Sequence, residues 1–74
     1  MTQITTPAEL GELIRQRRKQ AGLTLHEVSG LAGVGIRFLS ELERGKPTSQ
    51  LGLTLKVMQL LGLELSVEPR GRQR

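Results

Sequence analysis

Apolar residues recur along this chain at intervals of three and four, which is the spacing of one face of an α-helix. Ahead of the first such stretch, Thr6 and Glu9 have the spacing of a capping box, and Pro7 stands at the first helical position. This pattern predicts a helix over 7–21 that ends at Gly22. The residues expected on its inward face are Leu10, Leu13, Ile14 and Ala21.

The same signals predict three more helices. Thr24 and Glu27 repeat the capping-box spacing, and a glycine stands at each expected helix end. The helices are expected from just after Thr24 to about Ala32, from Ile36 to about Arg44, and between Ser49 and Gly62. The residues expected to face the core are Val28, Ala32, Leu39, Leu42, Leu51, Leu55, Val57, Met58 and Leu61.

Residues 63–68 alternate between apolar and polar side chains before Pro69, which predicts a short strand. Since no other segment alternates convincingly, the simplest partner for this strand is the same strand of a second copy. The residues expected to pair across that dimer are Leu63, Glu64, Leu65, Ser66 and Val67.

These elements predict a mostly α fold of four to five helices with a short C-terminal β-strand that pairs across a homodimer. The expected organisation is an N-terminal arm over 1–6, a helical domain over 7–62, a dimerisation strand over 63–68 and a basic tail over 69–74. A chain of 74 residues buries only about 60% of its unfolded surface on folding, which also favours self-association.

The amino-acid composition excludes several classes of protein. The absence of cysteine excludes disulfides and cysteine-based zinc sites, and one histidine cannot build a metal site alone, so we expect no cofactor. No apolar run approaches the length of a membrane span, and the first residues lack the features of a signal peptide, so we expect a cytoplasmic protein without a membrane partner. We expect no enzyme, because neither a nucleophilic constellation nor a phosphate-binding glycine loop is present.

The formal net charge is +4, which suits an anionic partner such as DNA but is also ordinary for a soluble domain. The positive charges fall into three patches: Arg15, Arg17, Arg18 and Lys19; Arg44 and Lys46; and Arg70, Arg72 and Arg74. The last patch is either an additional DNA contact or a solubilising end.

The central segment has the pattern of two short crossed helices. Such a unit requires a small residue at the crossing and a glycine in the sharp turn, and Ser29 and Gly33 occupy these positions. The remaining contact positions are apolar: Val28, Ala32, Val34, Leu39 and Leu42. This agreement predicts a DNA-reading helix-turn-helix, and the alternative is an αα-hairpin of a small bundle that binds no DNA.

Residues 10–63 resemble the XRE (lambda repressor/Cro-like) helix-turn-helix family, through the run from Gly22 to Lys46. Residues 37–48, with the helix and strand that follow, are similar to HipB-type antitoxins. The chain departs from the family pattern at Leu25, where the family often has glutamine, and at Gly35, where it often has serine or threonine.

The resemblance implies that the third helix enters the major groove with its first residues at base edges. The expected base readers are Gly35, Ile36, Arg37, Ser40 and Glu41. Arg37 could bind guanine O6 and N7, with a phosphate contact as its alternative, and Ile36 could touch a thymine methyl. Glu41 could accept from a cytosine amine, orient Arg37 or reject other bases.

Phosphate contacts are expected from the start of the second helix, from the end of the recognition helix and from the first helix. The residues are Thr24, Leu25, His26, Arg44, Lys46, Arg15 and Arg17. His26 has a solvated surface histidine as its alternative. The resemblance also implies an ion pair between Arg18 and Glu43 that orients the recognition helix, and the alternative is two exposed charges.

The implied function is a dimeric repressor that occupies a palindromic DNA operator. The HipB resemblance further implies an antitoxin that represses its own operon and binds a HipA-like kinase toxin. The alternatives are a stand-alone or phage-type repressor, and a protein-interaction module that neutralises a partner enzyme.

Overall fold

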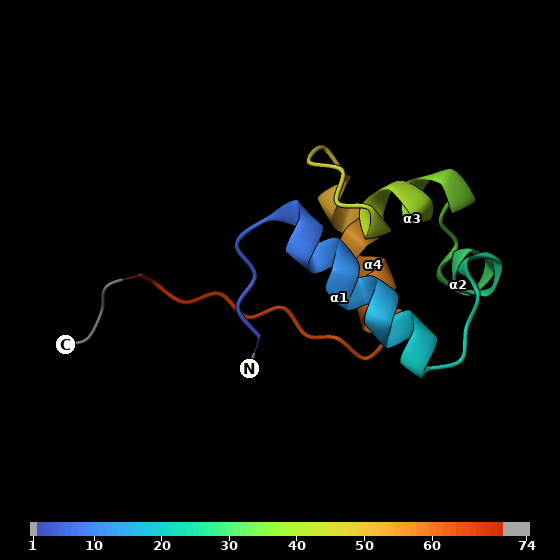
Figure 1. Ribbon diagram of the computed structural model, residues 1–74, viewed down its shortest axis with the longest axis horizontal. Helices are drawn as coiled ribbons and strands as arrows, with labels where there is room; N and C mark the ends of the chain where they lie inside the picture. Colours follow the sequence, from blue (N-terminus) through green and yellow to red (C-terminus); the bar gives the residue numbers. More distant parts are fainter. Residues whose placement is uncertain (1, 71–74) are drawn as a thin grey trace.

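The computed structural model describes residues 2–70, and these residues form four helices. The helices are α1 (Pro7–Gln20), α2 (Leu25–Ala32), α3 (Ile36–Glu43) and α4 (Leu51–Leu60). α3 packs against α1 and α2, and α2 also packs against α4 (Figure 1). The predicted mostly α architecture is confirmed.

Two of the helices begin with the predicted capping boxes. The Thr6 hydroxyl accepts from the Glu9 amide at 3.1 Å, and the Glu9 carboxylate accepts from the Thr6 amide at 3.1 Å. Thr24 and Glu27 make the same reciprocal contacts at 3.1 and 2.8 Å. These short-range contacts satisfy amides that lack a partner within the helix, and they explain why both helix starts could be predicted.

The Glu9 capping contact makes the stability of the fold depend on pH. Hydrogen bonds from the Thr5 amide and hydroxyl and from the Thr6 amide lower the pKa of Glu9 below its ordinary value of 4.5. The stabilisation is therefore complete above the unfolded-state pKa and is lost as the pH falls through the lower folded-state pKa. We expect Glu9→Gln to reduce the acid-induced loss of stability, measured by urea unfolding at neutral and acidic pH. Identical pH profiles of variant and parent would contradict this.

Glycines end the helices as predicted, since Gly22, Gly33, Gly45 and Gly62 all have positive φ. Two features require glycine at position 45. Its φ is 86°, and a Cβ atom there would lie 2.6 Å from the Ala8 Cα atom. The turn after α3 therefore packs directly against the start of α1.

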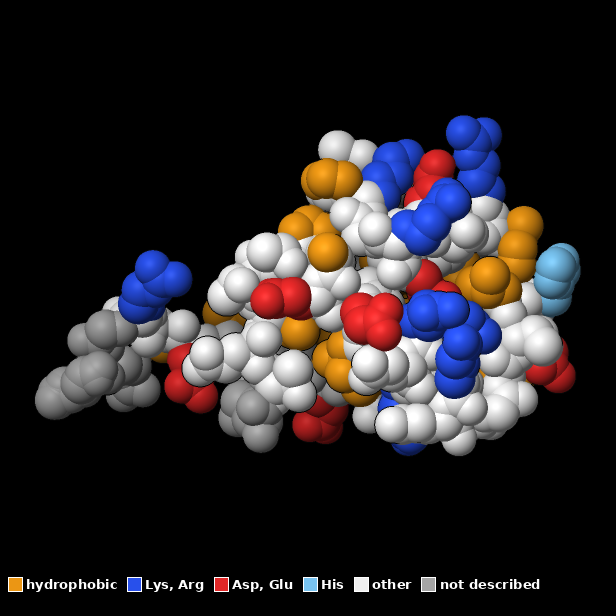
Figure 2. Space-filling model, viewed as in Figure 1, with side chains coloured by type: hydrophobic (Ala, Val, Ile, Leu, Met, Phe, Trp, Pro, Cys, Tyr) orange, Lys and Arg blue, Asp and Glu red, His pale blue; other side chains and the backbone are white. Residues whose placement is uncertain are grey.

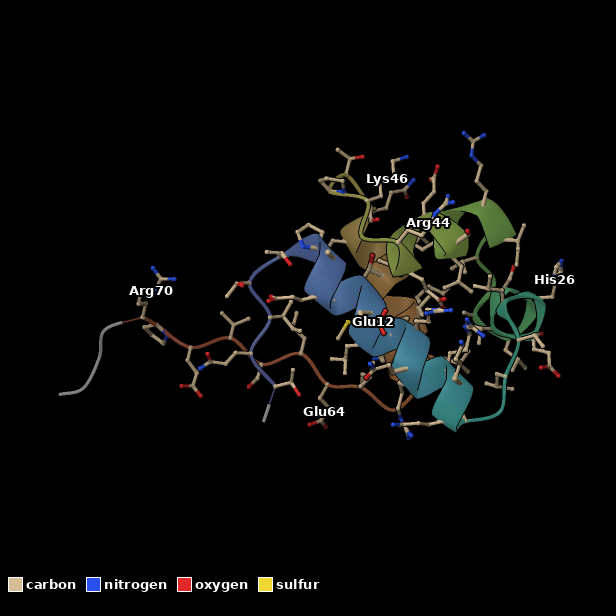
Figure 3. The ribbon with its side chains drawn as sticks, in the orientation of Figure 1. Glu12, His26, Arg44, Lys46, Glu64 and Arg70 are labelled. Carbon is tan, nitrogen blue, oxygen red and sulfur yellow. The ribbon has the colours of Figure 1, made fainter. Side chains whose placement is uncertain are left out.

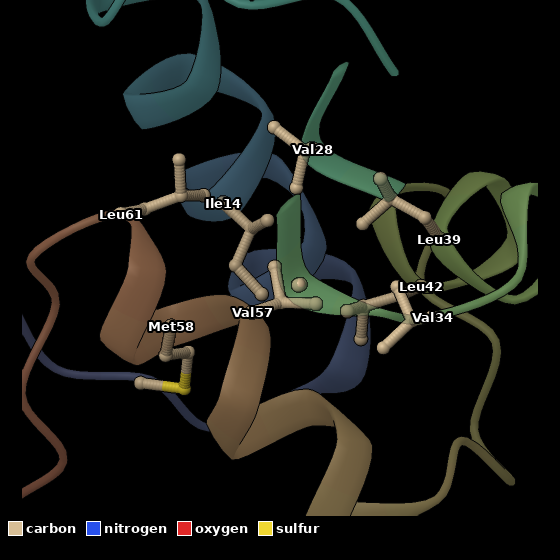
Figure 4. Close-up of a cluster of buried hydrophobic side chains, with 9 residues drawn as sticks. Ile14, Val28, Val34, Leu39, Leu42, Val57, Met58 and Leu61 are labelled. Atoms are coloured by element: carbon tan, nitrogen blue, oxygen red, sulfur yellow. The ribbon is translucent and has the colours of Figure 1, made fainter. Parts of the chain in front are cut away.

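The core lies where the four helices meet (Figure 4). Its members are Ile14, Val28, Ala32, Val34, Leu39, Leu42, Val57, Met58 and Leu61. Three residues expected there are exposed: Ala21, Leu51 and Leu55. Ala21 lies at the end of α1, beyond the packed turns. α4 is apolar on more than one face, so helical spacing alone could not say which leucines face inward.

Thr54 occupies the buried face of α4 instead. Its hydroxyl donates to the Gln50 carbonyl at 2.7 Å, which satisfies the polar group within the helix.

Residues 63–69 leave the helical body without forming a strand in the single chain (Figure 1). A strand requires a hydrogen-bonding partner, and the predicted partner is a second copy, so the pairing stays a prediction. Arg72 and Arg74 of the predicted basic tail lie outside the described residues. No helix in the range 2–70 is long and apolar enough to cross a membrane.

Candidate nucleic-acid interface

α2, a short turn and α3 form a closely packed unit. The apolar residues at its contact positions are buried: Val28, Ala32, Val34, Leu39 and Leu42. The Ser29 hydroxyl donates to the Val34 carbonyl, and Gly33 adopts the left-handed conformation between the two helices. The small residue and the glycine therefore have the positions that a helix-turn-helix requires.

One face of α3 remains open to solvent. Gly35 precedes it and makes no side-chain cap, so the first amides of α3 have no side-chain acceptor at that position. Ile36 is 37% exposed, and the Arg37 side chain is 90% exposed. Ser40 and Glu41 are half-buried one turn later. Four of the five expected base readers thus lie within the first two turns of α3, and Gly35 stands at its N-cap.

Glu41 contacts two cations on this face. Its Oε1 atom accepts from the Lys46 ammonium at 3.1 Å, and its Oε2 atom lies 3.5 Å from the Arg37 Nε atom. The hydrogen bond from Lys46, together with the charges of Lys46 and Arg37, lowers the pKa of Glu41 below its ordinary value. The carboxylate is therefore ionised at neutral pH and engaged on both oxygens.

Basic side chains gather over α3 and the loop that follows it (Figure 2). Arg44 is exposed directly after α3, and Lys46 follows it in the loop (Figure 3). Arg15 is exposed on α1. Arg44 and Arg15 are exposed enough to reach an anionic partner, and the exposed Lys46 is bonded to Glu41.

Arg17 has a different environment from Arg15. Its Nε atom donates to the Leu61 carbonyl at 2.8 Å, and the residue is half-buried. This contact joins α1 to the end of α4 through one of the five donors of the guanidinium, and the phosphate contact expected of Arg17 stays a prediction.

At the start of α2, the side chains expected to contact phosphates differ in how accessible they are. The Thr24 hydroxyl accepts from the Glu27 amide and keeps its hydrogen to donate, and Leu25 is half-buried against the core. His26 is exposed and points away from the helical body (Figure 3). The groups that remain open there include the His26 side chain and the first amides of α2.

Arg18 and Glu43 form a buried ion pair between α1 and the last turn of α3. The Arg18 Nε atom lies 2.7 Å from Glu43 Oε2, and the Arg18 Nη2 atom donates to Glu43 Oε1 at 2.9 Å. Arg18 Nη1 also donates to the Leu23 carbonyl at 2.9 Å. The hydrogen bonds to Glu43 raise the pKa of Arg18, although burial acts in the opposite direction. The two side chains are 10% and 5% exposed, so they are not free surface charges.

Sequence reasoning missed Gly11, which lies where α1 crosses α3. A Cβ atom there would lie 2.7 Å from the Glu43 carbonyl oxygen and would also collide with the carbonyl oxygen of Leu42. The available signal was a glycine in the middle of a well-formed helical pattern. The backbones of α1 and α3 therefore touch beside the Arg18–Glu43 pair.

Nothing in the described range suggests a metal centre, since residues 2–70 contain no cluster of three or more potential ligand side chains. The surface described above combines backbone amides, small polar groups, the apolar Ile36 and several cations with the Glu41 carboxylate. Such groups recognise phosphates and base edges.

Residues 9–70 match the family described as a helix-turn-helix domain. The chain belongs to the XRE-type helix-turn-helix family. It is 46% identical over 71 residues to the uncharacterized HTH-type transcriptional regulator y4mF of Sinorhizobium fredii (strain NBRC 101917 / NGR234), covering 96% of this chain and 93% of the relative. It is 40% identical over 58 residues to the transcriptional regulator ClgR of Mycobacterium tuberculosis, but these span 78% of this chain and 52% of ClgR.

This helix-turn-helix domain also resembles solved structures of HipB. The HipB–O4 20mer complex superposes with a TM-score of 0.84 at 23% identity, covering 95% of this chain and 99% of that one. The HipA–HipB–O2–O3 complex gives a TM-score of 0.85 at the same identity and the same coverage of both chains. The likeness establishes the fold, so the HipB-like architecture expected from the sequence is confirmed.

Proposed function

We propose that this chain is a sequence-specific DNA-binding transcriptional repressor that acts as a dimer. The observation that carries the proposal is the open face of α3, where Ile36, Arg37 and Ser40 stand on a helix supported from behind by the core. An α-helix fits the major groove, and side chains in its first turns reach base edges there.

The residues of this face suit direct reading of bases. Arg37 can bind O6 and N7 of a guanine, a contact worth about 1–3 kcal/mol of discrimination, and its side chain is 90% exposed. Ile36 can contact a thymine methyl, and the Ser40 hydroxyl can donate or accept. Arg44, Arg15 and the first amides of α2 would hold phosphates beside the groove, while the Lys46 ammonium is bonded to Glu41.

The apolar surface outside the core supports a dimer. α4 exposes Leu51 and Leu60, and the segment that follows exposes Leu65 and Val67, which is 85% exposed. Residues Leu55, Met58, Leu63 and Leu65 line a groove between α4 and this segment. Pairing of residues 63–67 with the same segment of a second chain would cover this surface and give the backbone N–H and C=O groups of the segment hydrogen-bonding partners. The molar mass in solution, measured by light scattering, tests it.

A two-fold dimer would present two copies of α3, one from each protomer. A two-fold arrangement of this kind matches a palindromic operator with half-sites about 10 base pairs apart, or a multiple of that spacing. Occupying such an operator would block transcription, and we propose repression by occlusion of the promoter.

A titration against DNA tests the proposal. We expect the purified chain to bind the DNA upstream of its own gene. Arg44→Ala should reduce the slope of log affinity against log salt by about 0.9 per half-site, which corresponds to the loss of one phosphate contact. Arg37→Ala should reduce the preference for this DNA over random DNA by about fivefold or more. Lys19→Ala, an exposed cation at the end of α1, is the matched control for charge. A parent protein that binds both DNAs equally, or neither at moderate salt, contradicts the proposal.

We further propose that the chain serves as the antitoxin of a kinase toxin. The support is the likeness to HipB as found in the HipA–HipB–O2–O3 complex. Co-expression with the product of the neighbouring gene tests this extension. A kinase-like protein that co-purifies supports it, whereas DNA binding without such a partner favours a stand-alone repressor. A partner bound without any DNA binding favours a protein-interaction module.

A further inference from the structure

The proposed DNA-binding face contains one carboxylate, and that carboxylate is less exposed than the two cations that it contacts. The Glu41 side chain is 23% exposed, against 90% for Arg37 and 47% for Lys46. Its two oxygens contact different cations, one from the first turn of α3 and one from the loop after α3. Glu41 therefore spans from the start of α3 to the loop beyond its end.

A carboxylate in this position opposes binding to arbitrary DNA. Phosphates are negative, and the major-groove edges of guanine, adenine and thymine all present acceptors that repel it. Only the amino groups of cytosine and adenine could donate to it. Such a donation would have to compete with the contacts to Arg37 and Lys46 that already occupy both oxygens.

We infer that Glu41 is a positioning residue that sets the sequence specificity of this face through Arg37 and Lys46 and does not itself read a base. The inference rests on the proposed DNA-binding function and selects the orienting role from the three roles that the sequence left open for Glu41. Glu41 orients the Arg37 guanidinium from one turn away, at the spacing of an i, i+4 pair. It also keeps Lys46 from a free contact with any phosphate.

This arrangement favours a guanine contact over a phosphate contact for Arg37. A long side chain that is already oriented loses less rotamer freedom when it forms a bidentate contact. Released from Glu41, the same guanidinium can follow whichever phosphate is near, and phosphate contacts carry no sequence information. Loss of the carboxylate should therefore increase affinity for all DNA and decrease selectivity.

Glu41→Gln tests the inference, because it removes the charge and keeps the shape. Parent and variant are each used to select binders from a pool of random duplexes of about 30 base pairs, long enough for two half-sites one helical turn apart. We expect the variant to bind unselected duplexes more tightly, with a salt slope steeper by about 0.9 for each Lys46 released to a phosphate. We expect its preference for the selected guanine to fall by about fivefold or more.

Two variants keep this test specific to the position of the charge. Glu12→Gln makes the same change of net charge on the exposed side of α1, and it should leave the base preference as in the parent (Figure 3). In an Arg37→Ala background, Glu41→Gln should no longer change the base preference, because no guanidinium remains to be oriented. Thermal unfolding of each variant verifies that the fold is intact.

The outcomes separate this inference from the function on which it rests. If the parent enriches no sequence, the proposed sequence-specific function fails. If the parent enriches a motif and Glu41→Gln enriches the same motif with equal selectivity, Glu41 positions nothing and the inference fails. If the variant instead loses preference at a cytosine or an adenine, and does so equally without Arg37, Glu41 reads a base directly and the inference is again overturned.

Discussion

Replacing Glu43 with glutamine should reduce the free energy of unfolding by about 3–5 kcal/mol, the cost typical of removing one member of a buried ion pair. The variant leaves the Arg18 guanidinium beside a neutral amide in a region where the two side chains are 10% and 5% exposed. The loss is a large fraction of the total stability of a small domain. Urea unfolding followed by circular dichroism measures it.

A double-mutant cycle identifies the pair as the source of this effect. Replacing both residues by apolar side chains, Arg18→Met with Glu43→Leu, should cost clearly less than the sum of the two single changes, since no unpaired charge remains. Glu12→Gln removes an exposed carboxylate of α1 and should leave the unfolding midpoint nearly unchanged. Additive effects of the two single changes would show that Arg18 and Glu43 act independently.

Gly11→Ala should also destabilise the protein, by about 1–3 kcal/mol or more, although alanine is the better helix former. The added methyl group would meet the carbonyl oxygens of Leu42 and Glu43, which are backbone atoms and cannot move aside as a flexible side chain can. α1 and α3 would have to separate, which would also stretch the nearby Arg18–Glu43 contact.

Gly30→Ala provides the matched control within α2. A Cβ atom at Gly30 meets nothing within 4 Å, so this change should stabilise the protein by up to about 1 kcal/mol through helix propensity. The comparison is made by thermal unfolding of both variants under identical conditions. Equal effects of the two substitutions would mean that the crossing at Gly11 has room for a side chain.

The helix boundaries could be predicted from the sequence because their causes are local. Thr6 and Glu9, like Thr24 and Glu27, satisfy one another over three residues, and the glycines after the helices adopt positive φ without help from distant contacts. The packing of α2 on α3 could also be predicted from the sequence. The small residue needed at the helix crossing, Ser29, and the glycine needed in the turn, Gly33, lie within one short segment of the chain.

Features that depend on distant contacts could not be predicted in the same way. Gly11 and Gly30 are both glycines within helices, and only the approach of α3 distinguishes the position that excludes a side chain. Leu55 has helical spacing, yet α4 turns Thr54 and Val57 inward, because the neighbouring helices decide which apolar face is covered. Arg15 and Arg17 are two arginines of the same helix, and the sequence does not distinguish them. Arg17 differs because its Nε atom donates to the Leu61 carbonyl, a contact that depends on where α4 ends in the fold.

Within the proposed face, the sequence indicated the residues but not their mutual contacts. Arg37 and Glu41 could be placed one helical turn apart from their numbers. The approach of Lys46 to the same carboxylate depends on how the chain turns at Gly45.

The crossing at Gly11 and the ion pair beside it attach the last turn of α3 to α1 at two adjacent points. We expect two helices joined in this way to move together, so that the tilt of α3 within a protomer is set before DNA binds. Any accommodation of unequal half-site spacing would then have to come from rotation of one protomer against the other. Residues 63–69 extend from the helical body, and we expect the tolerance of the proposed dimer for altered operator spacing to depend on this segment.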